Sequence, residues 1–328
     1  MANNSHTIII YKAIEMESNN IIVSGSPHIS AGRSTRRTMI DVIIALLPAL
    51  ACGVWVFGWR SLMVAGVTIV SCIATEYVCA RYMLRRGDAL KDCTAIVTGL
   101  LLAMTLPSSI PLPIAIVGGV FAIGVGKMAF GGTGQNIFNP ALVGRVFLLI
   151  SFPVEMTTWP LPMSADGHTG ATFLTAMRES GFDAASIDIA QMALGNMGGS
   201  LGEVGAIGIV AGWIYLGIRR VIRQVIPIAI LSTVALLAIV TGNNIAVELL
   251  SGGMLLGAIF MATDYVTSPM TTKGMAIYGV LIGVITFVIR HYGTYPEGIS
   301  FAILIMNGCT PLINKLTRPR VMGERRKR

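Results

Sequence analysis

Residues 39–59 read MIDVIIALLPALACGVWVFGW, an apolar segment long enough to cross a membrane. A helix needs about 20 such residues to cross a hydrocarbon core of about 30 Å. Nine further apolar segments lie at 62–84, 94–112, 114–130, 140–152, 204–218, 225–241, 246–262, 275–289 and 299–313. The composition agrees, because 54% of the 328 residues are hydrophobic and only 12% are charged, against about 25% in soluble domains. The sequence therefore predicts an all-α integral membrane protein with about ten transmembrane helices.

The basic residues predict how these helices are oriented. Lys and Arg accumulate in cytoplasmic loops, and here they cluster before the first apolar segment, after every second segment and in the C-terminal tail. Only Arg60, Arg178 and Arg290 fall in loops on the opposite side. Both termini are therefore expected to be cytoplasmic. Because the net charge of +8 is divided among these loops, membrane topology explains it and nucleic-acid binding does not.

A long polar stretch divides the chain into two halves. We expect a cytoplasmic N-terminal segment (1–38), a first five-helix repeat (39–152), a periplasmic loop (153–203), a second five-helix repeat (204–313) and a basic cytoplasmic tail (314–328). The two halves begin on opposite sides of the membrane, as an inverted-topology duplication requires. Pro107 and Pro269 interrupt apolar segments in corresponding places, which predicts discontinuous helices. Trp159 in the loop suits either an interfacial anchor or a packed aromatic residue.

The sequence GGTGQNIFNPA at 131–141 is a glycine-rich turn before the fifth apolar segment. It lacks the Lys-Ser/Thr ending of a phosphate loop. Asn139 is expected to cap a helix whose first turn contains Pro140. Such a helix start suits a flavin ring or a hydrated ion, with Asn136 and Asn139 as cofactor contacts, or it serves turn geometry alone. Arg145 is either a functional charge at membrane depth or a side chain that extends to the cytoplasmic surface.

Other polar residues near the apolar segments carry weaker signals. Glu76, Glu248 and Asp264 lie near segment ends, where they either line a cation path or are solvated. The five cysteines (Cys52, Cys72, Cys79, Cys93 and Cys309) form no CxxC pair and have no neighbouring histidine. Buried thiols at helix contacts explain them better than a metal site. We therefore expect no metal ligated by this chain, and we assign no catalytic residue.

The sequence DGHTGAT at 166–172 is the most distinctive stretch of the predicted periplasmic loop. Asp-Gly favours a tight turn, and Thr172 precedes an apolar-periodic run, so it is expected at a helix start. A turn with a capping threonine explains the stretch by itself. It also matches the pattern Asp-Gly-x-Ser/Thr-Gly-Ala-Thr, on whose last Thr a flavin transferase attaches FMN through a phosphoester. Asp166, Thr169, Gly170 and Ala171 would then surround the flavinylated Thr172.

These features together resemble the D subunits of Rnf electron-transport complexes, homologues of the B subunit of the sodium-pumping NADH:quinone oxidoreductase. The resemblance covers nearly the whole chain and is carried by Ser26-Pro27-His28, by Thr105-Leu106-Pro107 with 131–141, and by 166–172. It implies a protein of the bacterial inner membrane that relays electrons between ferredoxin and NAD within a complex that moves Na⁺ or H⁺. FMN would be esterified to Thr172, and riboflavin would bind noncovalently in the membrane part.

The resemblance also implies partners. These are the other Rnf subunits, including a second flavinylated periplasmic subunit and membrane subunits that hold an iron-sulfur centre, and a flavin transferase during maturation. Ferredoxin and NAD would be reached only through the complex. Two alternatives stay open: a component of a quinone reductase similar to its B subunit, and a secondary transporter, which inverted repeats and broken helices suit equally well. The short N-terminus favours the Rnf complex, and a covalent flavin would exclude a plain transporter.

Overall fold

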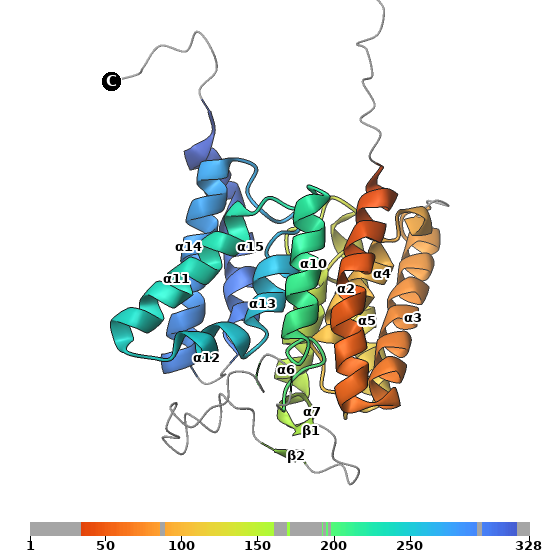
Figure 1. The fold of residues 1–328 in the computed structure, drawn as a ribbon. Coiled ribbons are helices and arrows are strands. Elements are labelled where there is room, and N and C mark those ends of the chain that lie inside the picture. Colours follow the sequence, from red (N-terminus) through yellow and green to blue (C-terminus); the bar gives the residue numbers. More distant parts are fainter. Residues whose placement is uncertain are drawn as a thin grey trace, which may run out of the picture. The chain divides into compact units, whose positions relative to one another are not determined.

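The computed structural model is mostly helical. It describes residues 34–85, 89–160, 169–170, 192, 195, 198–293 and 297–319. In chain order the elements are α2 (Thr35–Phe57), α3 (Trp59–Tyr82), η1 (Ala89–Asp92), α4 (Thr94–Met104), α5 (Leu112–Gly124), η2 (Met128–Phe130), α6 (Pro140–Ser151), α7 (Pro153–Thr157), β1 (Trp159–Pro160), β2 (Thr169–Gly170), α10 (Ala206–Ile218), α11 (Val225–Thr241), α12 (Ile245–Leu250), α13 (Met254–Leu256), the π-helix η4 (Gly257–Met261), α14 (Thr272–Tyr292) and α15 (Ile299–Thr317) (Figure 1).

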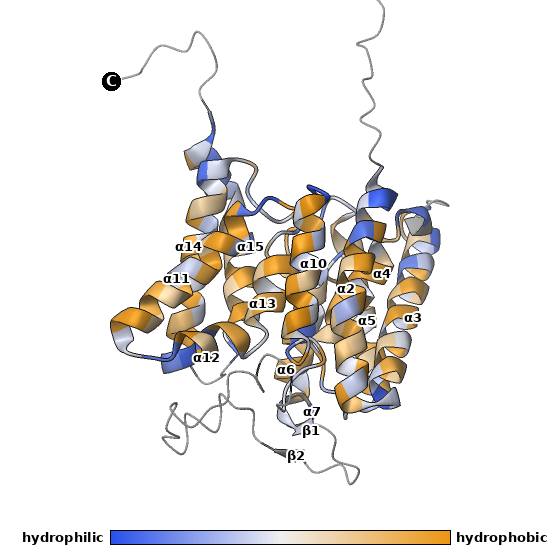
Figure 2. Ribbon diagram, in the orientation of Figure 1, coloured by the Kyte–Doolittle hydropathy of each residue, from blue (hydrophilic) through white to orange (hydrophobic). Residues whose placement is uncertain are grey.

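Several helices have the length and composition of membrane spans. Within the described residues, five are long and apolar enough to cross a bilayer: α2, α3, the run Leu112–Phe130 that contains α5, α14 and α15. Shorter apolar helices are α4, α6, α10 and α11. Figure 2 shows hydrophobic residues along the middle of the helices and hydrophilic ones mainly near their ends. This pattern is expected when lipid surrounds the helix middles and water the helix ends.

Two of the predicted apolar segments are not continuous helices. The helix predicted over 94–112 ends at Met104, because Pro107 cannot continue the helical hydrogen bonding. With 11 residues, α4 is only about 16 Å long and cannot cross the bilayer. The helix predicted over 246–262 is broken at Ser251–Gly253, where Gly252 and Gly253 have φ values of 63° and 64°. That segment consists of α12 and the short continuous pair α13 and η4.

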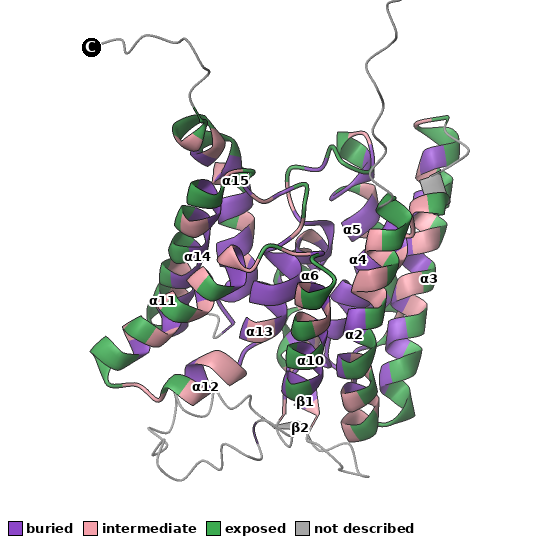
Figure 3. Ribbon diagram, turned by 45° about the horizontal axis from the view of Figure 1, so that its top comes forward, coloured by how far each residue is buried: buried purple, intermediate pink, exposed green. Residues whose placement is uncertain are grey.

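The two broken segments lie in the interior of the helix bundle. Ten residues of α4 are buried, and all five residues of η4 are buried. Figure 3 shows buried residues concentrated on α4, α6 and α13, whereas α3 and α11 carry many exposed ones. A helix that ends inside the bundle leaves backbone carbonyl groups without helical partners. Other parts of the chain must therefore supply donors there.

Glycines allow α10 to pack closely against α2. A β-carbon at Gly208 would come within 2.6 Å of the Ala49 nitrogen, and one at Gly212 within 2.2 Å of the Ala45 carbonyl oxygen. Both neighbours are backbone atoms that cannot move aside independently. Small residues at such spacing let membrane helices approach each other closely. This contact joins the first part of the chain to the second.

The same order of helix packing occurs twice along the chain. In the first part, α5 packs against α3 and α6, and α4 contacts α3 and α6. In the second part, α14 packs against α11 and α15, and η4 contacts α11 and α15. Each part therefore has one short interior segment held between longer helices.

Candidate functional site: an interior cavity and buried charge pairs

A cavity lies at the end of the bundle where α2 begins and α15 ends, called here the upper end. Its volume is about 110 Å³. This is smaller than the roughly 300–1,000 Å³ of ligand pockets for cofactor-sized molecules, whose linings are mostly apolar with a few polar groups. The polar residues of its wall are Thr94, Thr98, Lys127, Thr133, Asn136, Asn139, Thr263 and Asp264, and most of the remaining lining is apolar. The wall comes from α2, α4, the 133–140 segment, α10 and the residues around η4.

A buried ion pair fixes one side of this cavity. The Lys127 ammonium group donates to both carboxylate oxygens of Glu76, at 2.7 and 2.8 Å, and to Thr94 Oγ1 at 2.6 Å. Lys127 is only 3% exposed and Glu76 only 1%. The Thr94 hydroxyl also lies 3.4 Å from Thr133 Oγ1. The first residue of α4 is thereby tied to α3 and to the glycine-rich segment, and the solvated position considered for Glu76 is wrong.

The two asparagines predicted as cofactor contacts both line the cavity. Asn139 caps α6 as predicted, because its side chain accepts from the Ala141 amide at 3.0 Å and Pro140 occupies the first position of the helix. Its amide nitrogen donates to the carbonyl of Met261 at 3.0 Å. Asn139 thus holds the end of η4 with one half of its side chain and the start of α6 with the other. The Asn136 amide nitrogen donates to the Phe138 carbonyl at 3.0 Å.

Asp264 brings a carboxylate to the cavity wall. It accepts a hydrogen bond from Thr267 Oγ1 at 3.2 Å. Its position follows from the end of η4, since the chain leaves the helix at Ala262 and passes along the cavity at Thr263–Val266. The sequence marked Asp264 as acidic and close to an apolar segment, but only the fold places it opposite the residues of the glycine-rich turn.

Arg145 does not extend to the surface. Its guanidinium group forms an ion pair with Glu297 and donates to the Thr105 carbonyl at 2.6 Å, and the side chain is buried. Thr105 follows the last residue of α4, so Arg145 supplies a donor to a carbonyl at the interior end of that helix. The expectation of a snorkelling side chain is therefore wrong, and the charge is paired inside the bundle. A role of Arg145 as a functional charge and cofactor contact stays a prediction.

A second buried pair holds the start of the other short segment. Arg290 donates to the Glu248 carboxylate at 3.0 Å and to the carbonyl of Ser251 at 2.8 Å. These residues stand just before α13, as Thr94 stands at the start of α4. Glu248 is also buried, so a solvated position is wrong for it too. From the sequence, Arg290 was assigned to a loop, and no partner was predicted for it. Its place at the end of a long apolar segment was a signal that it could form a buried ion pair.

The sequence 166–172 falls mostly outside the described residues. Asp166, Ala171 and Thr172 belong to the part that is not described, and so does the expected helix start at Thr172. Thr169 and Gly170 form strand β2, which pairs antiparallel with β1 in the register Trp159 with Gly170 and Pro160 with Thr169. Trp159 is 4% exposed. This burial favours a packed aromatic residue over an interfacial anchor.

Comparison with known proteins places these features in a family. The model of the NQR2, RnfD, RnfE family matches residues 22–323. The chain belongs to this family. Family members related to it include the D subunit of the Na⁺-translocating ferredoxin:NAD⁺ oxidoreductase complex of Acetobacterium woodii, which is 44% identical over 93% of this chain and 96% of the relative. The D subunit of the proton-translocating complex of Clostridium ljungdahlii is 38% identical over 95% and 99%.

A third family member of similar likeness is the D subunit of the ion-translocating oxidoreductase complex of Halorhodospira halophila, with 42% identity over 93% of this chain and 96% of the relative. Family membership therefore confirms the resemblance found in the sequence. The names of the first two relatives differ in the ion that their complexes move. Membership in the family does not by itself select Na⁺ or H⁺ for this chain.

Proposed function

We propose that the chain is the flavin-carrying membrane subunit of an Rnf-type ion-translocating ferredoxin:NAD⁺ oxidoreductase complex. Its similarity over nearly its whole length to D subunits of such complexes is the observation that carries this proposal. The chain is a redox component of the translocase and is not catalytic alone. The reaction with ferredoxin and NAD belongs to the complex, and this chain relays electrons within it.

Covalent FMN on Thr172 is the first cofactor of this proposal. The sequence 166–172 matches the flavinylation pattern at every defined position. Gly170 and Ala171 leave little steric obstruction beside the hydroxyl that the flavin transferase must reach. If Thr172 begins a helix, the phosphate of FMN would be stabilised by the free amides there. Asp166 and Thr169 would serve recognition by the transferase.

A noncovalent flavin, riboflavin, is the second cofactor, and the lining of the upper cavity is suited to it. The wall is mostly apolar with a few polar groups, as a planar, largely apolar ring system requires, and the space of about 110 Å³ would have to widen to admit the ring. Asn136, Thr98 and Thr263 offer neutral polar groups along its wall, and Lys127 is already neutralised by Glu76. A ligand without a phosphate group therefore fits this wall better than FMN. A bound flavin supplies one-electron transfer, and the residues of the wall hold its ring and exclude lipid.

The finer topology belongs to the same proposal. Ten membrane segments in two inverted five-helix repeats would place both termini in the cytoplasm and 153–203 in the periplasm of a bacterial inner membrane. The repeated packing order, with a short interior segment in each part, supports a duplication. The pairs Lys127–Glu76 and Arg290–Glu248, which each hold the start of a short segment, support it further.

The partners recovered with the protein test the assignment. We expect gentle purification from its native membrane to recover the other Rnf subunits, including a second flavinylated one and membrane subunits with an iron-sulfur centre. Mass spectrometry of the purified assembly identifies them. Recovery with quinone-reductase subunits would instead assign the chain to the other branch of its family, and recovery without any redox protein would support a transporter.

Filling the cavity tests the site of the noncovalent flavin. Thr98 lines the cavity on α4 and is buried. We expect Thr98→Phe to lower the amount of noncovalent flavin released on denaturation, because the larger ring occupies the same space. Covalent flavin fluorescence of the same sample should not change. Ile96→Phe, on α4 but not in the cavity wall, is the control. Equal noncovalent flavin in Thr98→Phe and wild type would move the riboflavin site elsewhere.

A further inference from the structure

A group of buried charges lies at the lower end of the bundle, opposite the cavity. Its members come from different parts of the chain and are each at most 8% exposed: Arg145 on α6, Glu203 before α10, Glu248 on α12, Arg290 on α14 and Glu297 before α15. Arg145 pairs with Glu297, and Arg290 pairs with Glu248. Three carboxylates thus face two guanidinium groups. Of these three carboxylates, Glu203 is the one without an ion pair in the described part of the chain.

The Glu203 carboxylate ends beside a small closed cavity. A β-carbon built on Gly253 would lie 3.6 Å from Glu203 Oε1. Gly253 lines a cavity of about 10 Å³ together with Ser200, Arg145 and other residues. A cavity of this size accommodates about one water molecule. The carboxylate therefore lies near a small, mostly apolar space, and Glu203 itself is only 8% exposed.

Three buried polar atoms of the charge group and of the adjacent Ser200 have no hydrogen-bond partner in the described part of the chain. They are Glu203 Oε1, Ser200 Oγ and Arg290 Nε, all fully enclosed. Buried polar atoms almost always have a partner, and unpaired ones call for an explanation. Ser200 is 1% exposed and itself lines the cavity. The simplest explanation is that a further atom binds to Glu203 Oε1 and gives this oxygen the partner that it lacks.

The surrounding charges indicate which species this is. A negative excess of one charge on buried groups favours a single positive charge as its complement. An alkali ion requires several oxygen ligands, whereas the wall of this cavity includes the positively charged Arg145 side chain. A proton on the carboxyl group requires none of these ligands. It removes the excess charge and turns an unpaired acceptor into a donor.

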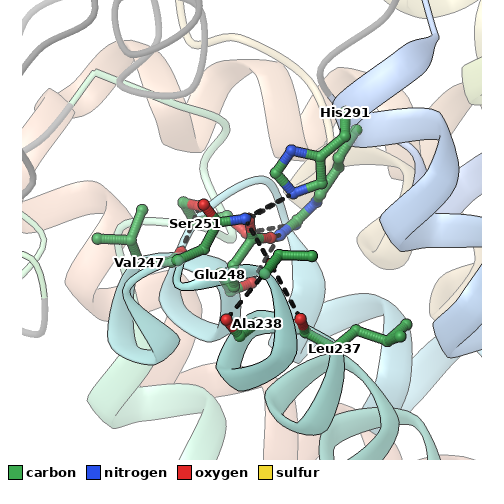
Figure 4. Close-up of polar contacts among 9 residues, drawn as sticks. Leu237, Ala238, Val247, Glu248, Ser251 and His291 are labelled. Carbon is green, nitrogen blue, oxygen red and sulfur yellow. Dashed lines mark hydrogen bonds and ion pairs between the residues drawn. The ribbon is translucent and has the colours of Figure 1, made fainter.

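We propose that Glu203 is a proton-binding site, coupled electrostatically to His291 at the lower surface. Figure 4 shows His291 facing Glu248, and its Nε2 lies 3.0 Å from Glu248 Oε1. Glu248 in turn bonds to Arg290, whose guanidinium also acts on Glu203. About a third of the His291 side chain is exposed. His291 is thus the partly exposed member of the charge group, and Glu248 and Arg290 couple its charge to Glu203.

Burial and the neighbouring charges act on the pKa of Glu203 in opposite directions. Burial raises the pKa of the Glu203 carboxyl above the usual glutamate range, and Arg145 and Arg290 lower it. Glu248 and Glu297 are already paired with those two arginines, which weakens the lowering. His291 contributes a positive charge only when it is protonated. Because burial is the largest effect, the carboxyl group keeps its proton at pH values where an exposed glutamate has lost it.

Infrared spectroscopy of the purified complex tests the proposal directly. We expect the carbonyl band of a protonated carboxylic acid at neutral pH, with a shift in D₂O and a loss as the pH is raised. Glu203→Gln should remove this band. Glu155→Gln, on α7 and outside the charge group, is the matched control and should keep it. His291→Gln should keep the band, because the Glu203 carboxyl group itself is unchanged.

The outcomes separate this proposal from the flavin assignment. A band that persists in Glu203→Gln, or that is absent from the wild type, would overturn it. Loss of the band on addition of Na⁺ at constant pH would also overturn it, because the site would then bind the metal ion. Glu203→Asp guards against a folding defect: it retains a carboxyl group and should show a shifted band. None of these readouts depends on Thr172 or on flavin content.

Discussion

Thr172→Ala is expected to abolish the covalent flavin of this protein completely. The phosphoester needs the Thr172 hydroxyl oxygen, and alanine offers no atom that can form the bond. In-gel fluorescence of the denatured chain should therefore fall from a clear signal to background. In the wild type, the peptide that contains Thr172 should carry the added mass of an FMN moiety. Electron transfer through the assembled complex should fall to background too, because one station of the relay is missing.

A neighbouring threonine provides the control for this substitution. Thr175→Ala removes a hydroxyl only three residues away and should retain full fluorescence. Noncovalent flavin should still be released from Thr172→Ala, since its proposed site in the upper cavity is lined by residues such as Thr98 and Asn136. Covalent fluorescence that survives in Thr172→Ala would show that another residue carries the flavin, and it would remove the main support for a redox role.

Much of the helical framework could be predicted from the sequence. The bounds of α3, α6, α10, α11 and α15 lie within a few residues of the predicted apolar segments. Hydrophobic length decides these helices because lipid imposes both helix formation and span length. The breaks at Pro107 and at Gly252–Gly253 were harder to predict, because apolar composition continues through them. Pro107 indicated a break in the first of these segments. The sequence did not indicate where α12 ends and α13 begins in the second.

The sequence indicated which residues belong to the site, but it did not indicate which residues they contact. Asn139 was expected to be a helix cap, and its neighbours Pro140 and Ala141 determine that local geometry. Its bond to Met261 spans more than a hundred residues and depends on how η4 packs. The ion-pair partner of Arg145 could not be predicted either, since Glu297 lies far away in the sequence. Local rules identify which residue needs a partner, but the tertiary fold selects the partner.

The two short interior segments explain why so many charges are buried in this membrane protein. An interior helix end lacks water, so the donors and acceptors there must come from side chains. Lys127 serves the start of α4, Arg145 its end, and Arg290 the start of α13. Each cation also has a carboxylate partner, which offsets part of its own desolvation. The ion pairs are thus tied to the ends of the two short interior segments.

Lys127→Met is expected to destabilise the protein by about 3–5 kcal/mol, the usual effect of removing one partner of a buried ion pair. Methionine fills a similar volume but leaves the Glu76 carboxylate buried without a counter-charge and Thr94 without its 2.6 Å donor. The start of α4 should loosen, and the upper cavity should lose its rigid wall. Thermal unfolding of the purified protein in detergent measures the stability, and the noncovalent flavin content reports the cavity.

A double substitution separates the lost pair from the lost lysine. Glu76→Gln combined with Lys127→Met leaves no unpaired charge, so it should recover most of the stability lost in Lys127→Met. Lys273→Met replaces an exposed lysine at the start of α14 and should change the unfolding temperature little. A double variant as unstable as Lys127→Met would contradict this account. The tie between Lys127 and Thr94, and not charge compensation with Glu76, would then be what holds α4 in place.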